Sequence, residues 1–165
     1  MPRLPQTAEE LRRRVADYLQ AHHTMTVATV SPEAAGNRPH AATVFYAVDD
    51  KLRLVFLSKT TSVHGSHIGK AAPVAVTVAA EYEDWEMIQG VQLWGEAHLL
   101  QGAARARAMT LYLVRFPFVR DLLRQPRLGD LVQNLGVYRV EPHRAAFTDN
   151  RTGLFGREVL ELVVE

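Results

Sequence analysis

The feature that most constrains this chain is a succession of short segments rich in β-branched residues and separated by turns, which begins at Thr24. Such segments favour strands, because branched side chains pack well on a pleated surface. The first three are joined by short turns that contain Pro32, Gly36 and Asp49–Lys51, so they predict an antiparallel meander. The predicted strands are Thr24–Val30, Pro39–Val48 and Leu52–Ser58.

Later segments continue the same pattern and bring the expected total to six or seven mostly antiparallel strands. Gly90 or Gly95 is expected to bend one of them, and Pro142 belongs at an edge or a bulge of another. A sheet of this size can remove its exposed edges by closing into a barrel that its own side chains fill. A large cofactor would then have to bind outside the barrel. These later strands are Pro73–Ala80, Met87–Leu100, Leu135–Phe147 and Glu158–Val164.

Helical patterns flank the strands. Thr7 and Glu10 have the spacing of a capping box, and an apolar stripe with a period of four residues follows and predicts a helix that ends near His22 or His23. Propensity favours further helices at Ala103–Val114 and Phe118–Arg124. The 165 residues therefore predict a single mainly β domain with flanking helices: an N-terminal helix (1–23), barrel strands (24–100), a helical insertion (101–130) and closing strands (131–165).

Composition excludes several classes of function. The chain has no cysteine, which rules out disulfides, thiolate metal sites and a cysteine nucleophile. A net charge of +1 does not mark a nucleic-acid-binding protein. No window approaches the run of about 20 apolar residues that a membrane helix needs. The first ten residues lack the apolar core of a signal peptide, so we expect a cytoplasmic protein without a membrane partner.

Chemistry-bearing residues gather after the third predicted strand, in the segment Ser58–His67. It holds hydroxyl groups, one lysine and two histidines, and Ser62 is the expected N-cap of a short helix. The free amides of a helix start, Lys59 and a protonated His64 or His67 would all attract a phosphate. The same residue types also occur in loops for turn formation alone, so composition leaves both interpretations open.

The sequence gives little support for a metal site or for catalysis by a nucleophilic side chain. His64 and His67 without a nearby carboxylate make a poor metal site, so no metal is expected. We found no serine in a nucleophile setting and no nucleophile–base pair, so the catalytic residues remain unknown. Missing acid–base residues are compatible with redox activity, because in a cofactor-dependent enzyme the cofactor carries the redox chemistry.

Four stretches together resemble the pyridoxamine 5'-phosphate oxidase-like flavin mononucleotide (FMN)-binding split barrels, in a little-characterised bacterial branch rather than the oxidase itself. The resemblance covers Thr24 to Gly156, and it depends on the order and spacing of the motifs. The motifs are the hairpin Thr24–Val30 with Pro39–Tyr46, the segment Leu54–Ser58 with Ser62–His64, the strands Pro73–Val78 and Gly90–Ala97, and the ending Phe147–Gly156.

This resemblance implies a homodimeric split barrel with FMN at the subunit interface. The isoalloxazine ring would lie along one strand, the phosphate would be bound after the next strand, and Gln92 would reach the polar edge of the ring from a neighbouring strand. The late helices and the loop at Asp149–Asn150 would come from, or face, the partner. The implied cofactor-binding residues are Thr43, Val44, Phe45, Ser58, Lys59, Ser62, Val63, His64 and Gln92.

The chain departs from the family pattern at two positions. Val63 stands where the family often has arginine or lysine, and Ala42 stands where the oxidase itself commonly has arginine. A lost charge-assisted hydrogen bond costs roughly 1.5–3 kcal/mol of phosphate binding. We expect a flavin-dependent oxidoreductase that acts on an unknown small molecule. A non-catalytic flavin- or haem-binding stress-response module and a deazaflavin-dependent reductase remain the alternatives.

Overall fold

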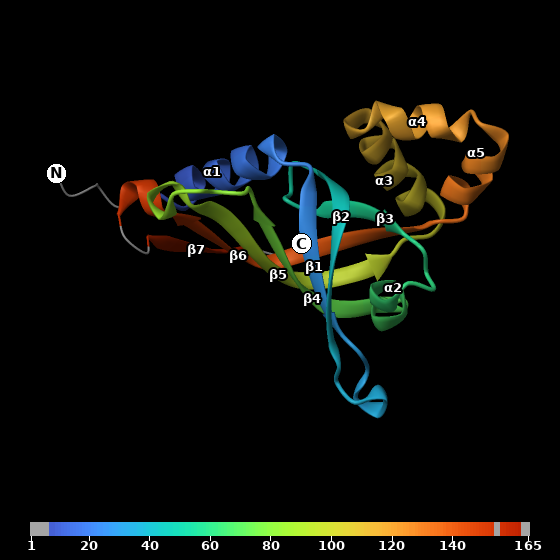
Figure 1. Ribbon diagram of the computed structural model, residues 1–165, viewed down its shortest axis with the longest axis horizontal. Helices are drawn as coiled ribbons and strands as arrows, with labels where there is room; N and C mark the ends of the chain where they lie inside the picture. The colour runs from blue at the N-terminus through green and yellow to red at the C-terminus, as the bar shows by residue number, and fades with distance from the viewer. Residues whose placement is uncertain (1–6, 154–155, 163–165) are drawn as a thin grey trace.

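The computed structural model describes residues 7–153 and 156–162, and it contains a single seven-stranded antiparallel sheet (Figure 1). The strand order is β3-β2-β1-β4-β5-β6-β7, and an additional pairing between β3 and β6 closes six strands into a barrel. β3 and β7 pair with successive parts of β6, so β7 extends the sheet beyond the barrel. The strands are β1 (Thr24–Val30), β2 (Pro39–Val48), β3 (Leu54–Ser58), β4 (Ala71–Ala79), β5 (Gln89–Leu99), β6 (Gly136–Asp149) and β7 (Arg157–Glu161).

The predicted N-terminal helix is confirmed as α1 (Ala8–Ala21), which lies across β5–β7 (Figure 1). Both bonds of the capping box form: the Glu10 amide donates to Thr7 Oγ1 at 3.2 Å, and the Thr7 amide donates to Glu10 Oε2 at 3.0 Å. The buried stripe of this helix joins the barrel core, and no helix in the described part of the chain is long and apolar enough to cross a membrane. The stripe consists of Leu11, Val15, Tyr18 and Leu19.

The expected meander β1-β2-β3 is confirmed, but β3 begins two residues later than predicted. Leu52 has a φ of 63°, so it belongs to the turn and not to the strand. The Asp49 carboxylate organises this turn, because it accepts hydrogen bonds from the amides of Lys51 at 3.0 Å and Arg53 at 2.9 Å. Side-chain acceptors of this kind stabilise turns that the strand pattern alone does not reveal.

β5 starts at Gln89 and not at Met87, because Trp85–Met87 form a short 3-10 turn capped by Asp84. Its pairing with β6 shifts register between Trp94 and Gly95, so the predicted bend lies at Gly95. Pro142 stands opposite Gly95 at this bulge, between the part of β6 that pairs with β3, which ends at Val140, and the part that pairs with β7, which begins at Arg144. Pro142 therefore lies both at a bulge and on a locally unpaired side of β6, in agreement with the prediction.

The helical insertion is longer than predicted and holds three helices: α3 (Gly102–Arg115), α4 (Pro117–Leu123) and α5 (Pro126–Gln133). The insertion therefore ends at 133 rather than 130. α5 was not predicted: Pro126 at its start is compatible with a helix, but Gly129 in its interior weakens the helix pattern. The insertion covers a second hydrophobic cluster on the outside of the barrel, which includes Ala47, Val55 and Val137.

The end of the chain also differs from expectation. β6 continues to Asp149, and Asn150–Thr152 form a 3-10 turn within the segment predicted to be a loop. β7 ends at Glu161, whereas the predicted strand ran to Val164, and the last two residues of that prediction lie outside the described residues.

Candidate functional site

The barrel is open along part of β2. β1 pairs with β2 from Pro39 to Phe45, whereas the register pairs β3 with β2 only from Tyr46 to Val48. The Tyr46 amide donates to the His23 carbonyl on the β1 side at 3.0 Å. Because alternate residues of an antiparallel strand point their backbone groups to opposite sides, the backbone groups of Thr43 and Phe45 face the open edge.

The short helix α2 (Val63–Ile68) follows β3, and Ser62 is its N-cap as predicted. Ser62 Oγ accepts from the Gly65 amide at 3.1 Å and donates to the Lys59 carbonyl at 2.7 Å. A Cβ at position 65 would collide with the Lys59 carbonyl and approach Ser62 Oγ to 2.9 Å, so only glycine lets the helix begin this close to the loop. With six residues, α2 is too short for its N-terminus to bind an anion without help from side chains.

Polar side chains lie close to the start of this helix. Ser58 Oγ lies 3.2 Å from Ser62 Oγ and 2.6 Å from His64 Nε2, so the two hydroxyls and the imidazole form one contiguous cluster. The end of β3 positions Ser58, and the first turn of α2 positions the other two. The structure therefore brings together three of the residues that the sequence singled out. Lys59 and Val63 flank them with exposed side chains.

His40 belongs to the same region, although the sequence analysis did not single it out. Its ring stacks on that of His64 with centroids 5.9 Å apart and an interplanar angle of 8°, and the His67 ring lies 6.0 Å away, edge-on. His67 Nδ1 is in turn 3.0 Å from Thr29 Oγ1. His40 has the same strand parity as the inward-facing Val44, and that parity was the sequence signal that could have identified it.

Burial changes the chemistry expected of His64. Its side chain is almost fully buried, and this burial lowers the pKa of His64, as do the neighbouring imidazoles of His40 and His67. His64 is therefore neutral near pH 7 in the absence of an anion, whereas the sequence suggested a protonated histidine. Among the described residues no group of three or more potential ligands is arranged to hold a metal ion.

A groove of about 950 Å³ adjoins the histidines and runs over β1, β2 and β4, lined by His40, His67 and Trp94 among others. The register places Trp94, Ala75, Ala28 and Ala41 side by side on the outer face of four successive strands. Small side chains in the middle of this row leave a flat, mostly apolar surface.

Thr43 and Gln92 belong to the next row of the same outer face, with Thr26 and Thr77 between them. β5 is therefore not the neighbour of β2, because β1 and β4 separate them. Three strand spacings correspond to about 14 Å, so one chain does not bring Gln92 to the open edge at Thr43.

Aromatic side chains lie at the end of the open edge where β2 begins to pair with β3. Phe45 is 47% exposed, and its ring lies 5.4 Å from that of Phe116 and 6.0 Å from that of Phe118, at the junction of α3 and α4. Val44 points the other way and packs against the barrel core. The helical insertion thus reaches the segment that the sequence associated with a ring system.

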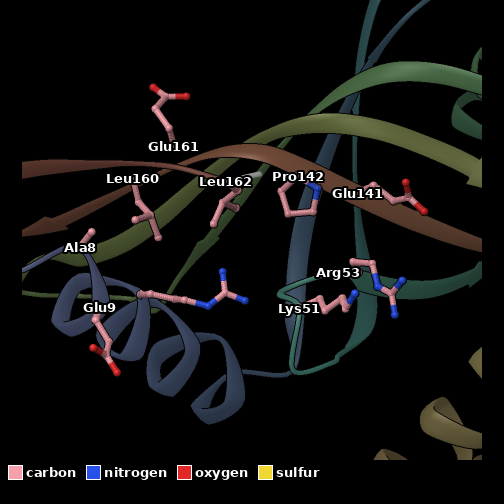
Figure 2. A pocket seen from close by; sticks show the side chains of 10 residues that line it. Ala8, Glu9, Lys51, Arg53, Glu141, Pro142, Leu160, Glu161 and Leu162 are labelled. Carbon is pink, nitrogen blue, oxygen red and sulfur yellow. The ribbon is translucent and has the colours of Figure 1, made fainter. Parts of the chain in front are cut away.

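A second cavity, of about 530 Å³, lies between α1, the β2–β3 turn, β6 and β7 (Figure 2). Arg12, Lys51 and Arg53 contribute cations to its lining, but three glutamates line it as well. Arg53 forms an ion pair with Asp49 at 2.6 Å. This mixed set of charges lacks the hydroxyl–imidazole cluster of the first site, so we place the candidate site at β2, β3 and α2.

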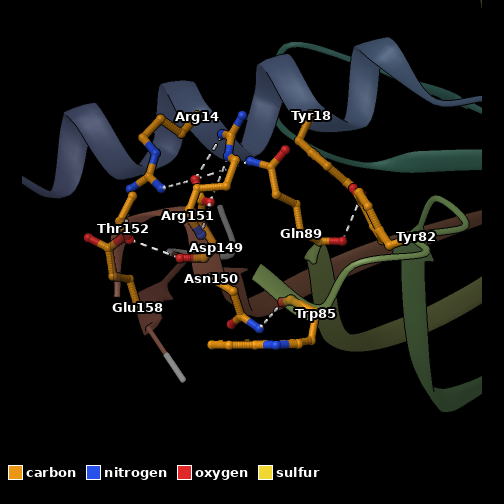
Figure 3. A network of polar contacts seen from close by, with 10 residues as sticks. All are labelled: Arg14, Tyr18, Tyr82, Trp85, Gln89, Asp149, Asn150, Arg151, Thr152 and Glu158. Carbon is orange, nitrogen blue, oxygen red and sulfur yellow. Dashed lines mark hydrogen bonds and ion pairs between the residues drawn. The ribbon is translucent and has the colours of Figure 1, made fainter. Parts of the chain in front are cut away.

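The expected partner-facing loop at Asp149–Asn150 makes contacts within its own chain (Figure 3). The buried Asp149 carboxylate accepts hydrogen bonds from Arg14, Arg151 and Gln89, and so connects α1, β5 and β6. Asn150 Nδ2 donates to the Trp85 carbonyl at 2.8 Å.

A six-stranded barrel with one extra strand, opened along β2 and followed by a hydroxyl cluster at a short helix, defines the split-barrel class of proteins. Residues 11–149 match the family described as pyridoxamine 5'-phosphate oxidase, and the chain belongs to that family.

Proteins called UPF0306 are among its relatives. One from Klebsiella pneumoniae is 34% identical over 119 residues, which cover 72% of this chain and 73% of the relative. One from Cronobacter sakazakii is 30% identical over 152 residues, which cover 92% and 94% of the two chains. The matches cover most of both chains, so the relatives share most of the domain and not just the Ser58–His67 segment.

Solved structures with this fold are more distant in sequence. A haem-binding protein from Mycobacterium smegmatis has a TM-score of 0.71 at 17% identity, and the match covers 96% of this chain but only 60% of that one. HutZ, a haem storage protein from Vibrio cholerae, has a TM-score of 0.63 at 14% identity, with coverage of 79% and 88%. A Clostridium acetobutylicum protein related to general stress protein 26 has a TM-score of 0.63 at 11% identity, with coverage of 93% and 96%.

Proposed function

We propose that this chain is an FMN-binding protein that acts as a homodimer, and that it is an oxidoreductase for a small molecule. The observation that carries the proposal is the cluster of Ser58, Ser62 and His64 at one end of the open β2 edge. Hydroxyls and an imidazole are suitable donors for a phosphate monoester, and unpaired strand backbone is suitable for the polar edge of a flat ring.

The donor set fits FMN in two parts. The Ser58 hydroxyl would donate to the phosphate, and the Ser62 hydroxyl would do so by exchanging its bond to the Lys59 carbonyl for one to the anion, with Lys59 supplying a positive charge nearby. The backbone groups of Thr43 and Phe45 on the open edge would bind the ring, whose flat face would lie against the apolar strand surface. When bound, the isoalloxazine supplies hydride transfer, and the chain's own residues orient it and exclude water.

A second copy of the chain would complete this site. The groove over β1, β2 and β4 is open to solvent, and its small side chains suit close contact with another surface. Gln92 is about three strand spacings from Thr43 within one chain, so it would reach a ring only from the partner. Size determination by light scattering is expected to give twice the 18.5 kDa chain mass, and a monomeric mass would contradict the dimer.

A haem-binding function is the second candidate, because one observation favours it. His40 and His67 line the apolar groove, and an imidazole beside an apolar surface is a common axial haem ligand. Two proteins of the same fold bind or store haem according to their names. Val63, in place of a basic residue, also keeps a deazaflavin in consideration as the cofactor.

The phosphate assignment predicts a large effect of Ser58→Ala on cofactor affinity. Loss of a charge-assisted hydrogen bond of about 1.5–3 kcal/mol weakens FMN binding roughly tenfold to a hundredfold. Riboflavin lacks the phosphate, so its affinity is expected to change by less than about threefold. Fluorescence titration of both ligands measures these values. Ser66→Ala, an exposed position on the same helix, is the control, and equal FMN affinity in both variants would refute the assignment.

A further inference from the structure

We propose that recognition of a phosphate monoester in this site is coupled to uptake of a proton by the imidazoles of His40, His64 and His67. Affinity for the anion would then weaken as the pH rises above neutrality. This inference rests on the proposed function and adds to it a dependence of that site on pH. It starts from three neighbouring imidazoles: His64 stacks on His40, His67 lies edge-on to His40, and His64 and His67 have different hydrogen-bond partners.

Geometry links the three imidazoles into one unit. The His40 ring contacts both of the others, at centroid distances of 5.9 Å and 6.0 Å. Thr29 holds His67, and Ser58 holds His64. Because Ser58 also contacts the Ser62 hydroxyl, an anion that accepts from the two serines would lie beside the His64 ring.

None of the described residues of α2, β1 and β4 has a carboxylate that could pair with the three imidazoles. α2 packs against β1, β2, β4 and β5. From β5, His98 lies 3.3 Å from Glu96, so these two groups are paired with each other. Glu33 lines the far side of the groove. The nearby cations with exposed side chains are Arg38, Lys59 and Lys70.

The direction of the effect follows from the unliganded state. Burial lowers the pKa of His64, and the two neighbouring imidazoles lower it further, so the His64 imidazole loses its proton easily without an anion. A phosphate dianion beside His64 would raise this pKa, because an opposite charge within about 4–6 Å favours the protonated imidazole. Between the pKa values of the free and bound states, binding takes up a proton, and affinity falls up to tenfold per pH unit.

Two other groups limit how strongly the FMN affinity depends on pH. The exposed Lys59 side chain adds attraction for the anion that does not come from the imidazoles. The phosphate itself gains a proton near pH 6, which weakens its binding at the acid end. FMN affinity is therefore expected to be greatest near pH 6–6.5, whereas an arginine or lysine at position 63 would give attraction that persists to high pH.

Calorimetric titration of the protein, freed of ligand, with FMN at pH 7.5 tests this coupling. The heat is measured in two buffers with different ionisation enthalpies, and the difference gives the number of protons taken up. FMN is expected to take up about half to one proton, and its affinity to fall fivefold or more between pH 6.5 and 8.5. Riboflavin, without a phosphate, should take up none.

Matched variants distinguish proton uptake by this cluster from proton uptake by other histidines. His64→Gln keeps a hydrogen-bonding side chain for Ser58 but cannot be protonated, so FMN binding should lose most of its proton uptake. His40→Gln should reduce it as well. His143→Gln changes an exposed histidine elsewhere and should leave the uptake unchanged. FMN binding without proton uptake and with constant affinity would refute the coupling but not the proposed function, whereas binding of neither flavin would refute both.

Discussion

Substitution of Gly95 by alanine is expected to lower the free energy of unfolding by about 3 kcal/mol or more. Gly95 lies at the bulge between β5 and β6, where a Cβ would collide with the Glu141 carbonyl and lie 2.7 Å from the Pro142 Cα. Both obstacles are backbone atoms of β6, which pairs with β5 at these residues and with β3 and β7 directly before and after them, so neither can move without disturbing the barrel.

Gly90→Ala is the matched control for this prediction, since it introduces the same methyl group in the same strand. Its Cβ would lie 3.4 Å from the Val78 carbonyl oxygen, within the reach of a small adjustment. Urea unfolding of the two variants compares them directly. If both changed stability by the same amount, the close approach at Gly95 would not be what constrains the barrel at this bulge.

Asp149→Ala is expected to cost about 3 kcal/mol, because it leaves two arginines without their shared carboxylate (Figure 3). Arg151 donates to Asp149 through Nε at 2.9 Å and Nη2 at 3.0 Å, and Arg14 approaches the same carboxylate at 3.3 Å. This carboxylate connects the first helix to the end of β6, so its loss loosens the attachment of α1. The exposed Asp17, changed to alanine, is the control.

The same carboxylate predicts how this difference in stability depends on pH. Burial on its own would raise the pKa of Asp149, but the hydrogen bonds and charge of Arg151 and the amide of Gln89 outweigh it, and the pKa is lower than usual. A lowered pKa in the folded state contributes stability above the unfolded pKa of about 4, and this contribution is lost as the pH falls through the folded value. The difference between wild type and Asp149→Ala should therefore be constant from pH 5 to 8 and shrink below pH 4. An unchanged difference at pH 3 would contradict this account.

Local sequence signals predicted most of the fold because they depend on neighbours in the chain. The capping box at Thr7, the hairpin β1–β2 and the N-cap at Ser62 all formed with the predicted residues. The sequence did not indicate where β2 separates from β3, because that depends on β3 pairing with β6, a segment about 80 residues away. The open edge of the barrel is therefore a consequence of tertiary pairing.

In the candidate site, too, the sequence predicted the contacts between residues that are close in the chain and not those that depend on tertiary packing. Ser58, Ser62 and His64 lie within seven residues, so their proximity follows from a single turn. His40 comes from another strand, and its contact with His64 depends on how α2 packs against the inward side of β2. Gln92 is a different case: the resemblance associates it with a ring, and two intervening strands separate it from Thr43 within one chain, so its role stays a prediction that depends on a second copy.

The central claim is that the cluster at Ser58, Ser62 and His64 binds the phosphate of FMN. The most direct test is the visible spectrum of the protein as purified, together with the mass of any ligand released on denaturation. We expect flavin absorption bands and release of FMN, with about one molecule per chain after addition of FMN. A Soret band with released haem, or no FMN binding after such addition, would contradict it.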